Sequence, residues 1–259
     1  LRLEFLNDLM AFESSRIIIT SFFLLVLING YNFIDGVNNL STLNFIIILI
    51  FLYLLSYEYD NFNSSKIQTL ILLFSVFIIF NFFGKSFLGD GGVYGISFLI
   101  GILFIKLSLI TDKISPYFIA NLLWYPAFEN LFSIIRRALN KKKNYLADNF
   151  HFHHLILKIF LKKKFFRKKY LSSSATGIII NSYLFMGYFI GYMSYSKTSI
   201  QVLLILTNIL IYIFIYNLLL KIIYLIYINF LYAKYNCCYR WCRICRLKSY
   251  RKVFKKNKF

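Results

Sequence analysis

Residues 17–34, IIITSFFLLVLINGYNFI, form a long apolar run that becomes polar over its last six positions. A helix needs about 20 predominantly apolar residues to cross the hydrocarbon core of a bilayer. None of the apolar runs alternates like a barrel strand, so the sequence predicts an all-α polytopic membrane protein. About seven transmembrane helices are expected, because six further runs follow at approximately Leu43–Tyr57, Ile67–Phe83, Val93–Ile110, Tyr117–Ile134, Ala175–Tyr195 and Ile200–Tyr232.

The composition supports a membrane protein and explains the strong positive charge. Hydrophobic residues make up 59% of the chain, and the mean hydropathy is +0.64, which is too apolar for a soluble domain of this length. The net charge is +20. Because successive spans cross the membrane in opposite directions, the loops between them alternate between its two sides, and one side receives 23 Lys and Arg residues. Short cytoplasmic loops are enriched in these residues, so that face is predicted to be cytoplasmic. Attraction to anionic lipid then accounts for the charge, and nucleic acid is excluded as a partner.

Two parts of the chain are expected. Residues 1–232 form a transmembrane bundle that includes a cytoplasmic loop at 135–174, and residues 233–259 form a basic cytoplasmic tail. The tail contains all four cysteines, with the spacing Cys-Cys-x3-Cys-x2-Cys. Zinc sites usually separate two ligand pairs by a longer loop, so reduced thiols are favoured over a zinc site for Cys237, Cys238, Cys242 and Cys245.

The first polar segment runs from Asn29 to Leu40, at the cytoplasmic end of the first predicted span. Asn29, Asn32 and Asp35 are three positions apart, which predicts a polar stripe that faces neighbouring helices rather than lipid. Such side chains are costly at this depth unless they are paired or functional. A helix-packing network is the alternative interpretation.

The second segment, Phe87 to Gly95, has the sequence Phe-Leu-Gly-Asp-Gly-Gly-Val-Tyr-Gly. Its glycines allow the backbone to approach a ligand, and Asp90 precedes a predicted helix, where phosphate or Mg²⁺ can bind. The alternative is that Asp90 is an N-cap and that the glycines form a helix-packing face.

The third segment contains every histidine of the chain within four positions of the most basic loop. Arginine binds phosphate bidentately and imidazole supplies donors, so this group is suited to a diphosphate. A solvated loop is the alternative, and a zinc site lacks a second carboxylate at a known spacing. The side chains in this group are Arg136, Arg137, Asp148, His151, His153 and His154.

Charge counting places all three segments on the predicted cytoplasmic face. Soluble nucleotide-activated substrates are found on that side of a membrane. Three unrelated packing features are a weaker explanation than one site that binds Mg²⁺ and a diphosphate.

The three segments together resemble the polyprenyl-phosphate N-acetylhexosamine-1-phosphate transferases, which are related to phospho-N-acetylmuramoyl-pentapeptide transferase. Asn29 to Leu40 resembles the family's Asn-x-x-Asn-x-x-Asp-Gly motif, Phe87 to Gly95 resembles Phe-Leu-Gly-Asp-x-Gly, and Ala147 to His154 resembles Ala-Asp-Arg-x-His-x-His-His. The form His-x-His-His is similar to the N-acetylhexosamine branch. The resemblance covers roughly residues 17–220.

This resemblance implies a Mg²⁺-dependent transfer of a sugar-1-phosphate from a UDP-sugar to polyprenyl phosphate, with release of UMP. Asp35 and Asp90 would be catalytic, and Asp90 and Asn32 would hold Mg²⁺, with Mn²⁺ as an alternative. Phosphoryl transfer depends chiefly on positioning and charge neutralisation, which such a site provides. The implied substrate-binding residues are Asn29, Asn38, Arg136, Arg137, Asp148, His151, His153 and His154.

The implied partners are UDP-N-acetylhexosamine, undecaprenyl phosphate and the bilayer of a bacterial inner membrane, and a homodimer is left open. Such enzymes start cell-envelope polysaccharides, including O-antigen. The three segments do not identify the sugar.

The chain departs from the family pattern in three places. An aspartate pair at the cytoplasmic end of an earlier helix has no counterpart, so we expect the chain to be an N-terminally truncated fragment that is inactive alone. Asn38 and Asn39 stand where many members have Asp-Gly, and Asn149 replaces Arg.

Two other classes of function are considered. A transporter or flippase would need ionisable residues near the middle of the membrane, and the spans contain few besides Lys106, Lys221 and Glu129. An inactive lipid-binding or scaffold homologue is suggested by the missing aspartate pair.

Overall fold

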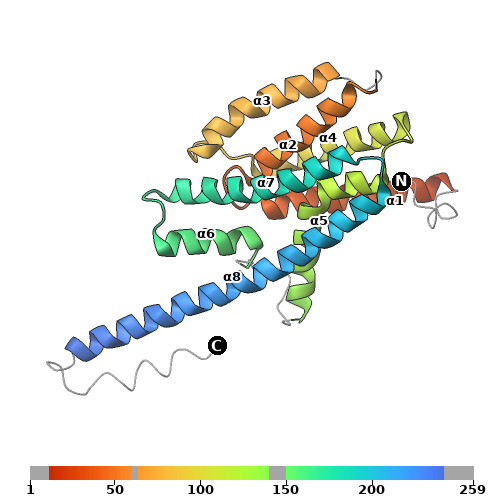
Figure 1. Ribbon diagram of the computed structural model, residues 1–259. Coiled ribbons are helices and arrows are strands. Elements are labelled where there is room, and N and C mark those ends of the chain that lie inside the picture. The colour runs from red at the N-terminus through yellow and green to blue at the C-terminus, as the bar shows by residue number, and fades with distance from the viewer. Residues whose placement is uncertain (1–11, 60–63, 140–149, 242–259) are drawn as a thin grey trace. The chain divides into compact units, whose positions relative to one another are not determined.

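The computed structural model describes residues 12–59, 64–139 and 150–241, with side chains described as far as residue 228 (Figure 1). Within these ranges the regular structure is entirely helical, which confirms the predicted fold class. The helices are α1 (Glu13–Ile34), α2 (Leu40–Ser56), α3 (Ser64–Phe82), α4 (Gly89–Ile110), α5 (Pro116–Leu139), α6 (Phe152–Lys163), α7 (Lys169–Met193) and α8 (Thr198–Trp241).

Every predicted span coincides with a helix, but the helices differ in how well they suit a membrane. Five in the described part are long and apolar enough to cross one: α1, α3, α4, α5 and the part of α8 from Thr198 to Ile228. Helix α2 is apolar but has only 17 residues. Helix α7 has 25 residues, but several of its buried side chains are polar, including Ser172, Ser174 and Asn181. The protein is therefore a multi-pass membrane protein, and the count of seven crossings stays a prediction.

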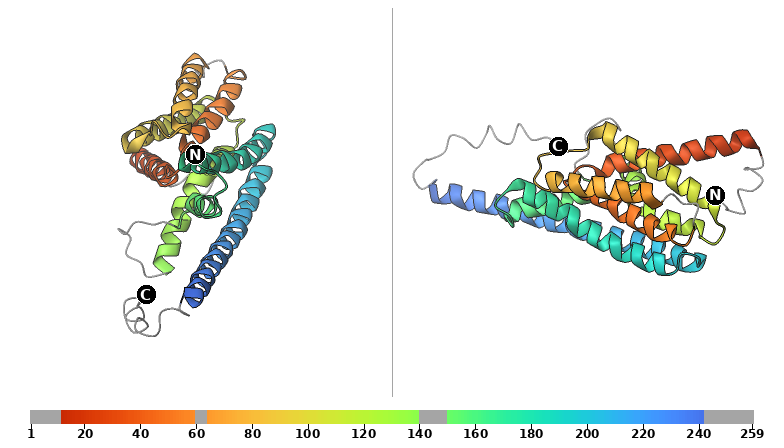
Figure 2. Two further views of the ribbon diagram at one scale, coloured as in Figure 1. Left: turned by 90° about the vertical axis from the view of Figure 1, so that its left-hand side faces the viewer. Right: turned by 90° about the horizontal axis from the view of Figure 1, so that it is seen from above.

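Two groups of helices form the bundle. Helix α1 packs against α4 and α5, whereas α2 packs against α3 and α7, and α6 lies against α7 (Figure 2). Close approach within the first group depends on small residues. A Cβ atom at Gly30 would lie 2.8 Å from the carbonyl oxygen of Pro126 in α5, and one at Gly101 of α4 would meet Leu24 of α1.

Side-chain amides and hydroxyls join the ends of α2, α3 and α7. The backbone N–H of Asn39 donates to Oδ1 of Asn81 (2.6 Å), and Oγ of Ser174 donates to the carbonyl of Phe82 (2.7 Å). The Asn181 amide donates to the carbonyl of Leu40 (2.9 Å). Helix ends leave backbone groups without helical partners, and lipid offers none. These contacts therefore hold the helix ends in register.

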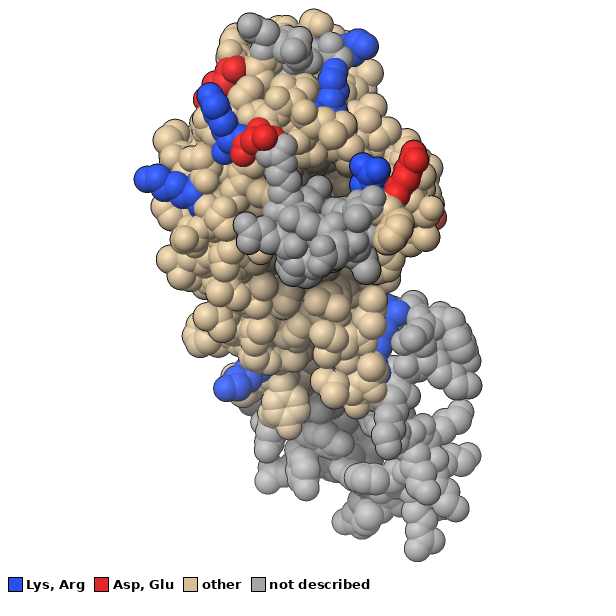
Figure 3. All heavy atoms as spheres, turned by 90° about the vertical axis from the view of Figure 1, so that its right-hand side faces the viewer, with Lys and Arg blue, Asp and Glu red and all other residues tan. Residues whose placement is uncertain are grey.

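We call this end of the bundle the motif end, because the described parts of the three polar segments all lie there. It contains the C-terminal ends of α1 and α3, the N-terminal ends of α2, α4 and α7, and helix α6. Figure 3 shows the opposite end, where acidic and basic side chains are interspersed rather than gathered by sign. The turn from α6 to α7 at the motif end carries only basic charges: Lys162, Lys163, Lys164, Arg167, Lys168 and Lys169.

The chain separates into two compact units, Leu1–Tyr216 and Asn217–Phe259, at a point inside α8. The boundary predicted from the sequence is at residue 232, the end of the predicted last span. Helix α8 continues to Trp241, and the division into a bundle and a basic tail at residue 232 stays a prediction. The side chains of the four cysteines lie outside the described residues.

Replacement of Gly177 with Ala is expected to destabilise the bundle. The new Cβ would lie 2.3 Å from the carbonyl oxygen of Asn38 and 2.9 Å from the backbone nitrogen of Leu40, and backbone atoms cannot swing aside. Such overpacking typically costs about 1–3 kcal/mol. The melting temperature in detergent should therefore fall by several degrees. Gly187→Ala in the same helix is the control, because its Cβ would meet only the side chain of Asn208, at 3.3 Å. An equal effect of the two variants would contradict this account.

Candidate active site

Asp35 follows the last residue of α1 and is half-buried at the motif end. Ser41, in the first turn of α2, donates a hydrogen bond to its carboxylate. Burial raises the pKa of Asp35 to about 6; the bond from Ser41 lowers it, and the charge of Asp90 raises it. A carboxylate in this setting favours a positively charged ligand, because a cation offsets both the burial and the repulsion.

Asp90 lies in the first turn of α4 and is exposed. Gly89 precedes it with φ +64°, a left-handed conformation that favours glycine. The start of α4 is tied to α1, because the amide of Asn32 donates to the hydroxyl of Tyr94 (3.3 Å). The first two polar segments therefore come together in space.

The oxygen atoms of Asp35, Asp90 and Asn32 are ligands of the kind that Mg²⁺ prefers. Mg²⁺ is usually held by one or two carboxylates and completed by phosphate oxygens and water. In the described part of the chain, no group of three or more His, Cys, Asp or Glu side chains is placed to hold a metal by itself. The residues present thus fit a cation that shares its coordination with a phosphate-bearing substrate.

The histidine segment is a helix terminus rather than an extended loop. His151 is the N-cap of α6, and His153 and His154 lie in its first turn. The rings of His151 and His153 are stacked with centroids 5.5 Å apart, and those of His153 and His154 are 4.3 Å apart. The predicted loop at 135–174 therefore contains a helix of 12 residues whose buried face includes Phe152, Leu155 and Ile159. The high lysine content of this segment favours a solvated loop, which is why this helix was not predicted from the sequence.

Gly36 brings the first and third polar segments into contact. A Cβ atom at this position would lie 2.6 Å from Nε2 of His153 and 2.9 Å from Cε1 of His154. The ring of His151 lies 5.5 Å from the ring of Phe33, measured between centroids. Only a residue without a side chain allows the histidines to lie this close to the end of α1.

His153 is fully buried, and neither of its ring nitrogens has a hydrogen-bond partner among the described residues. Burial lowers its pKa well below the usual value, and the charges of His154 and His151 lower it further. The ring is therefore uncharged near neutral pH. Buried polar groups without partners are rare in native structures, so these nitrogens are candidates for contact with a ligand.

The depressed pKa of His153 predicts a loss of stability in acid. A proton binds more tightly to the unfolded chain, where the pKa of histidine is about 6.5. The contribution of the neutral ring is therefore fully present above about pH 6.5 and is lost as the pH falls toward the folded-state pKa. Melting temperatures measured from pH 8 to pH 5 should fall more steeply for the wild type than for His153→Gln. Parallel curves would show that burial of His153 is not linked to protonation.

Glu129 anchors the first histidine from inside α5. It is 1% exposed, and its Oε1 accepts from Nδ1 of His151 (3.0 Å) and from the backbone N–H of Phe152 (3.1 Å). Its Oε2 accepts from the hydroxyl of Tyr212 in α8 (2.6 Å). A carboxylate can only accept, so Nδ1 of His151 carries the hydrogen.

Glu129 was not among the site residues predicted from the sequence. The available signal was its position, because a lone carboxylate in a membrane span is costly unless it is paired. The partners could not be read from the sequence, since Tyr212 and His151 are 83 and 22 residues away.

Loss of the Glu129 carboxylate is expected to be strongly destabilising. Glu129→Ala leaves three buried donors without their acceptor, and removal of one partner of such a buried group costs about 3 kcal/mol or more. Glu58→Ala is the control, because Glu58 is exposed and accepts one hydrogen bond, from the hydroxyl of Tyr195. Thermal melts in detergent should separate the two variants clearly. A similar small shift for both would mean that the buried network contributes little.

The two arginines occupy different places. Arg136 donates to the hydroxyl of Tyr216 (2.5 Å), to Oγ of Ser133 (3.0 Å) and to the carbonyl of Phe150, so it fixes the backbone just before His151. The guanidinium of Arg137 lies 6.0 Å from the ring centroid of Phe33, beside the end of α1. Arg137 therefore lies beside the first polar segment.

Two predicted site residues, Asn29 and Asn38, do not join this group. Asn29 is exposed and its amide donates to the carbonyl of Leu25 in its own helix (2.8 Å), so the prediction that it faces neighbouring helices is wrong. Asn38 is buried among α2, α3 and α7, where its backbone N–H donates to Oγ of Ser173 (2.9 Å). Its place is explained by helix packing. Asp148 lies outside the described residues.

Comparisons with known proteins give one finding. No curated protein and no solved structure matches the chain. The family model described as glycosyl transferase family 4 matches residues 3–108, a stretch that contains the first two polar segments but ends before the histidines. Over these residues the chain is similar to a family that, in general, transfers sugar phosphates to polyprenyl phosphate, which supports a transferase.

Proposed function

We propose that the protein transfers an N-acetylhexosamine-1-phosphate from a UDP-sugar to undecaprenyl or another polyprenyl phosphate and releases UMP. The observation that carries this proposal is the contact of Gly36 with His153 and His154, beside the carboxylates of Asp35 and Asp90. Groups suited to a cation and groups suited to a diphosphate thus share one end of a membrane bundle. The family match over residues 3–108 supports the same class of reaction.

The reaction would proceed by attack of a lipid phosphate oxygen on the phosphorus atom next to the sugar. A new phosphorus–oxygen bond forms, the bond to the bridging oxygen breaks, and the bridging oxygen leaves with UMP. Asp35, Asp90 and Asn32 would hold Mg²⁺, or Mn²⁺ as the alternative, and the metal would neutralise charge on the diphosphate.

The histidines would hold and orient the sugar diphosphate. His153 offers neutral ring nitrogens without partners among the described residues, and His151 is fixed by Glu129. Arg137 would add positive charge at the end of α1, and Asp148 of the same segment is proposed as a further contact. Most of the catalytic effect would come from positioning, which a buried and hydrogen-bonded frame provides.

The proposal extends to the biological setting. The motif end would face the cytoplasm of a bacterium, where nucleotide sugars are made, and the lipid phosphate would be presented from the inner membrane. The product would start a cell-envelope polysaccharide such as O-antigen.

A donor panel tests the proposal. The full-length gene product in native membranes would be given UDP-N-acetylglucosamine, UDP-N-acetylgalactosamine or UDP-glucose together with undecaprenyl phosphate and Mg²⁺. We expect UMP only with an N-acetylated sugar and only when the lipid is present. Binding of lipid without UMP from any donor would instead support an inactive lipid-binding homologue.

A further inference from the structure

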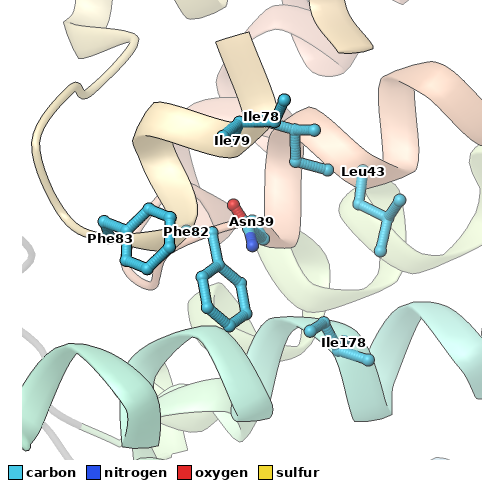
Figure 4. A pocket seen from close by; sticks show the side chains of 7 residues that line it. All are labelled: Asn39, Leu43, Ile78, Ile79, Phe82, Phe83 and Ile178. Carbon is cyan, nitrogen blue, oxygen red and sulfur yellow. The ribbon is translucent and has the colours of Figure 1, made fainter. Parts of the chain in front are cut away.

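A cavity lies on the outer side of the bundle between α2, α3 and α7 (Figure 4). Its volume is about 410 Å³, and its lining is apolar apart from one amide. The lining residues are Asn39, Leu43, Ile78, Ile79, Phe82, Phe83 and Ile178. Ligand sites typically have volumes of roughly 300–1,000 Å³, and an apolar cavity of about 150 Å³ already holds benzene.

The cavity is open toward the surroundings of the bundle rather than toward its core. Ile79 is 57% exposed, Phe83 48% and Ile178 39%. Ile79 belongs to α3, Ile178 belongs to α7, and Phe83 directly follows α3; all three lie within about three helical turns of the motif end, in the predicted membrane region. At this depth the surrounding medium is lipid, so an alkyl chain is the ligand that the lining suits.

The mouth of the cavity is basic and aromatic. The ring of Phe83 contacts the ring of Tyr170 (centroids 6.2 Å apart), and Nζ of Lys168 lies 5.6 Å from the Tyr170 ring centroid. Gly84 brings the two helices together, because a Cβ there would lie 3.5 Å from Cβ of Tyr170. Lys85 follows directly and is exposed. Aromatic rings with lysines are characteristic of the interface between hydrocarbon and lipid headgroups.

We propose that this cavity binds an anionic phospholipid of the surrounding leaflet. One acyl chain would occupy the space between α2, α3 and α7, and the phosphate would lie beside Lys85 and Lys168. The charge of the mouth argues for an anionic over a zwitterionic headgroup, because α3, α7 and the described residues 83–89 contain no acidic residue. Two acidic residues at this end, Asp35 and Asp90, belong to the candidate active site.

The proposed lipid site is separate from the candidate active site. The cavity is lined by α2, α3, α7 and the turn at Asn39, whereas Asp35, Asp90 and the histidines belong to α1, α4 and α6 and their adjoining turns. Asn39 links the two regions, because it follows the Asp35 turn and its N–H is bound by Asn81 of α3. A bound lipid would therefore support the helix ends that position the active site without being a substrate.

Native mass spectrometry of the purified full-length protein tests the proposal. The probes are dioleoyl phosphatidylglycerol and dioleoyl phosphatidylcholine. We expect the wild type to retain one molecule of the anionic lipid and Ile178→Trp, which fills the cavity, to bind it at least about tenfold more weakly. Ile179→Trp is the matched control, because this neighbouring residue is 50% exposed and does not line the cavity.

A headgroup variant separates the charge from the cavity. Lys85→Gln with Lys168→Gln should lower the preference for the anionic lipid by about 25-fold, because each lysine contributes roughly a factor of five near an anionic surface. Lys66→Gln with Lys197→Gln, at the other end of the bundle, should leave the preference unchanged.

Three results would overturn the proposal: equal lipid retention by Ile178→Trp and Ile179→Trp, equal binding of both lipids by the wild type, or displacement of the bound lipid by stoichiometric undecaprenyl phosphate. The last would identify the cavity as an acceptor site instead. If Ile178→Trp does not fold, Ile79→Trp fills the same cavity from α3 and gives the same comparison.

Discussion

Replacing Asp90 with Asn is expected to lower the rate of UMP release by the full-length protein at least about 100-fold, the scale on which loss of one electrostatic group at a transition state is felt. Asp90 is exposed at the start of α4, and its charge raises the pKa of Asp35. The two carboxylates are therefore close enough to interact electrostatically, and one cation could interact with both. The amide keeps the shape of the side chain but removes the charge that would bind Mg²⁺. Turnover is measured at saturating undecaprenyl phosphate over a series of Mg²⁺ concentrations.

Asp112→Asn is the control for this prediction. Asp112 is an exposed carboxylate just after α4, at the opposite end of that helix. It should leave turnover within a factor of two of the wild type, as roughly expected for a surface change. Near-normal turnover of Asp90→Asn would remove Asp90 from the proposed metal site.

Replacing Gly36 with Ala is expected to reduce activity by about 10-fold to 100-fold, since a shift of about 1 Å at a reacting group can cost that much. The added Cβ would lie 2.6 Å from Nε2 of His153 and 2.9 Å from Cε1 of His154, so the rings or the end of α1 must move. The loss should appear mainly as a higher KM for the UDP-sugar. Initial rates at varied donor concentration give the KM and kcat separately.

Gly95→Ala is the matched control, because a Cβ on this glycine of α4 would meet nothing within 4 Å. Both variants add one methyl group near the motif end, and only Gly36→Ala places it against the histidines. Equal activity of the two would mean that the contact between α1 and α6 is not needed for catalysis.

The sequence was most informative about the helices and about the end of the bundle at which the polar segments meet. Each of the seven apolar runs is a helix, because an amide backbone in lipid has few other ways to satisfy its hydrogen bonds. The motifs at Asp35, Asp90 and His151 lie at alternate helix ends, and an antiparallel bundle brings such ends to one side. Their proximity could thus be predicted from topology alone.

The contacts within the site could not be predicted in the same way. Glu129 binds His151 across a segment whose path the sequence does not define, and Tyr212 reaches the same carboxylate from α8. For Asn29 the sequence predicted a contact with neighbouring helices that the structure does not contain. A spacing of three residues does not say which side of a helix is covered by its neighbours. Periodicity places side chains on one helix, whereas burial depends on the partners that the rest of the chain supplies.

Transfer of a sugar phosphate, rather than of the sugar alone, is revealed by the stoichiometry of the two products. The full-length protein would be incubated with UDP-N-acetylglucosamine, undecaprenyl phosphate and Mg²⁺, and both products quantified by liquid chromatography and mass spectrometry. We expect UMP and undecaprenyl diphosphate-linked sugar in equal amounts, and Asp90→Asn should form both at least about 100-fold more slowly. Release of UDP in place of UMP, or a lipid product with a single phosphate, would contradict the account, because the sugar alone would then have been transferred.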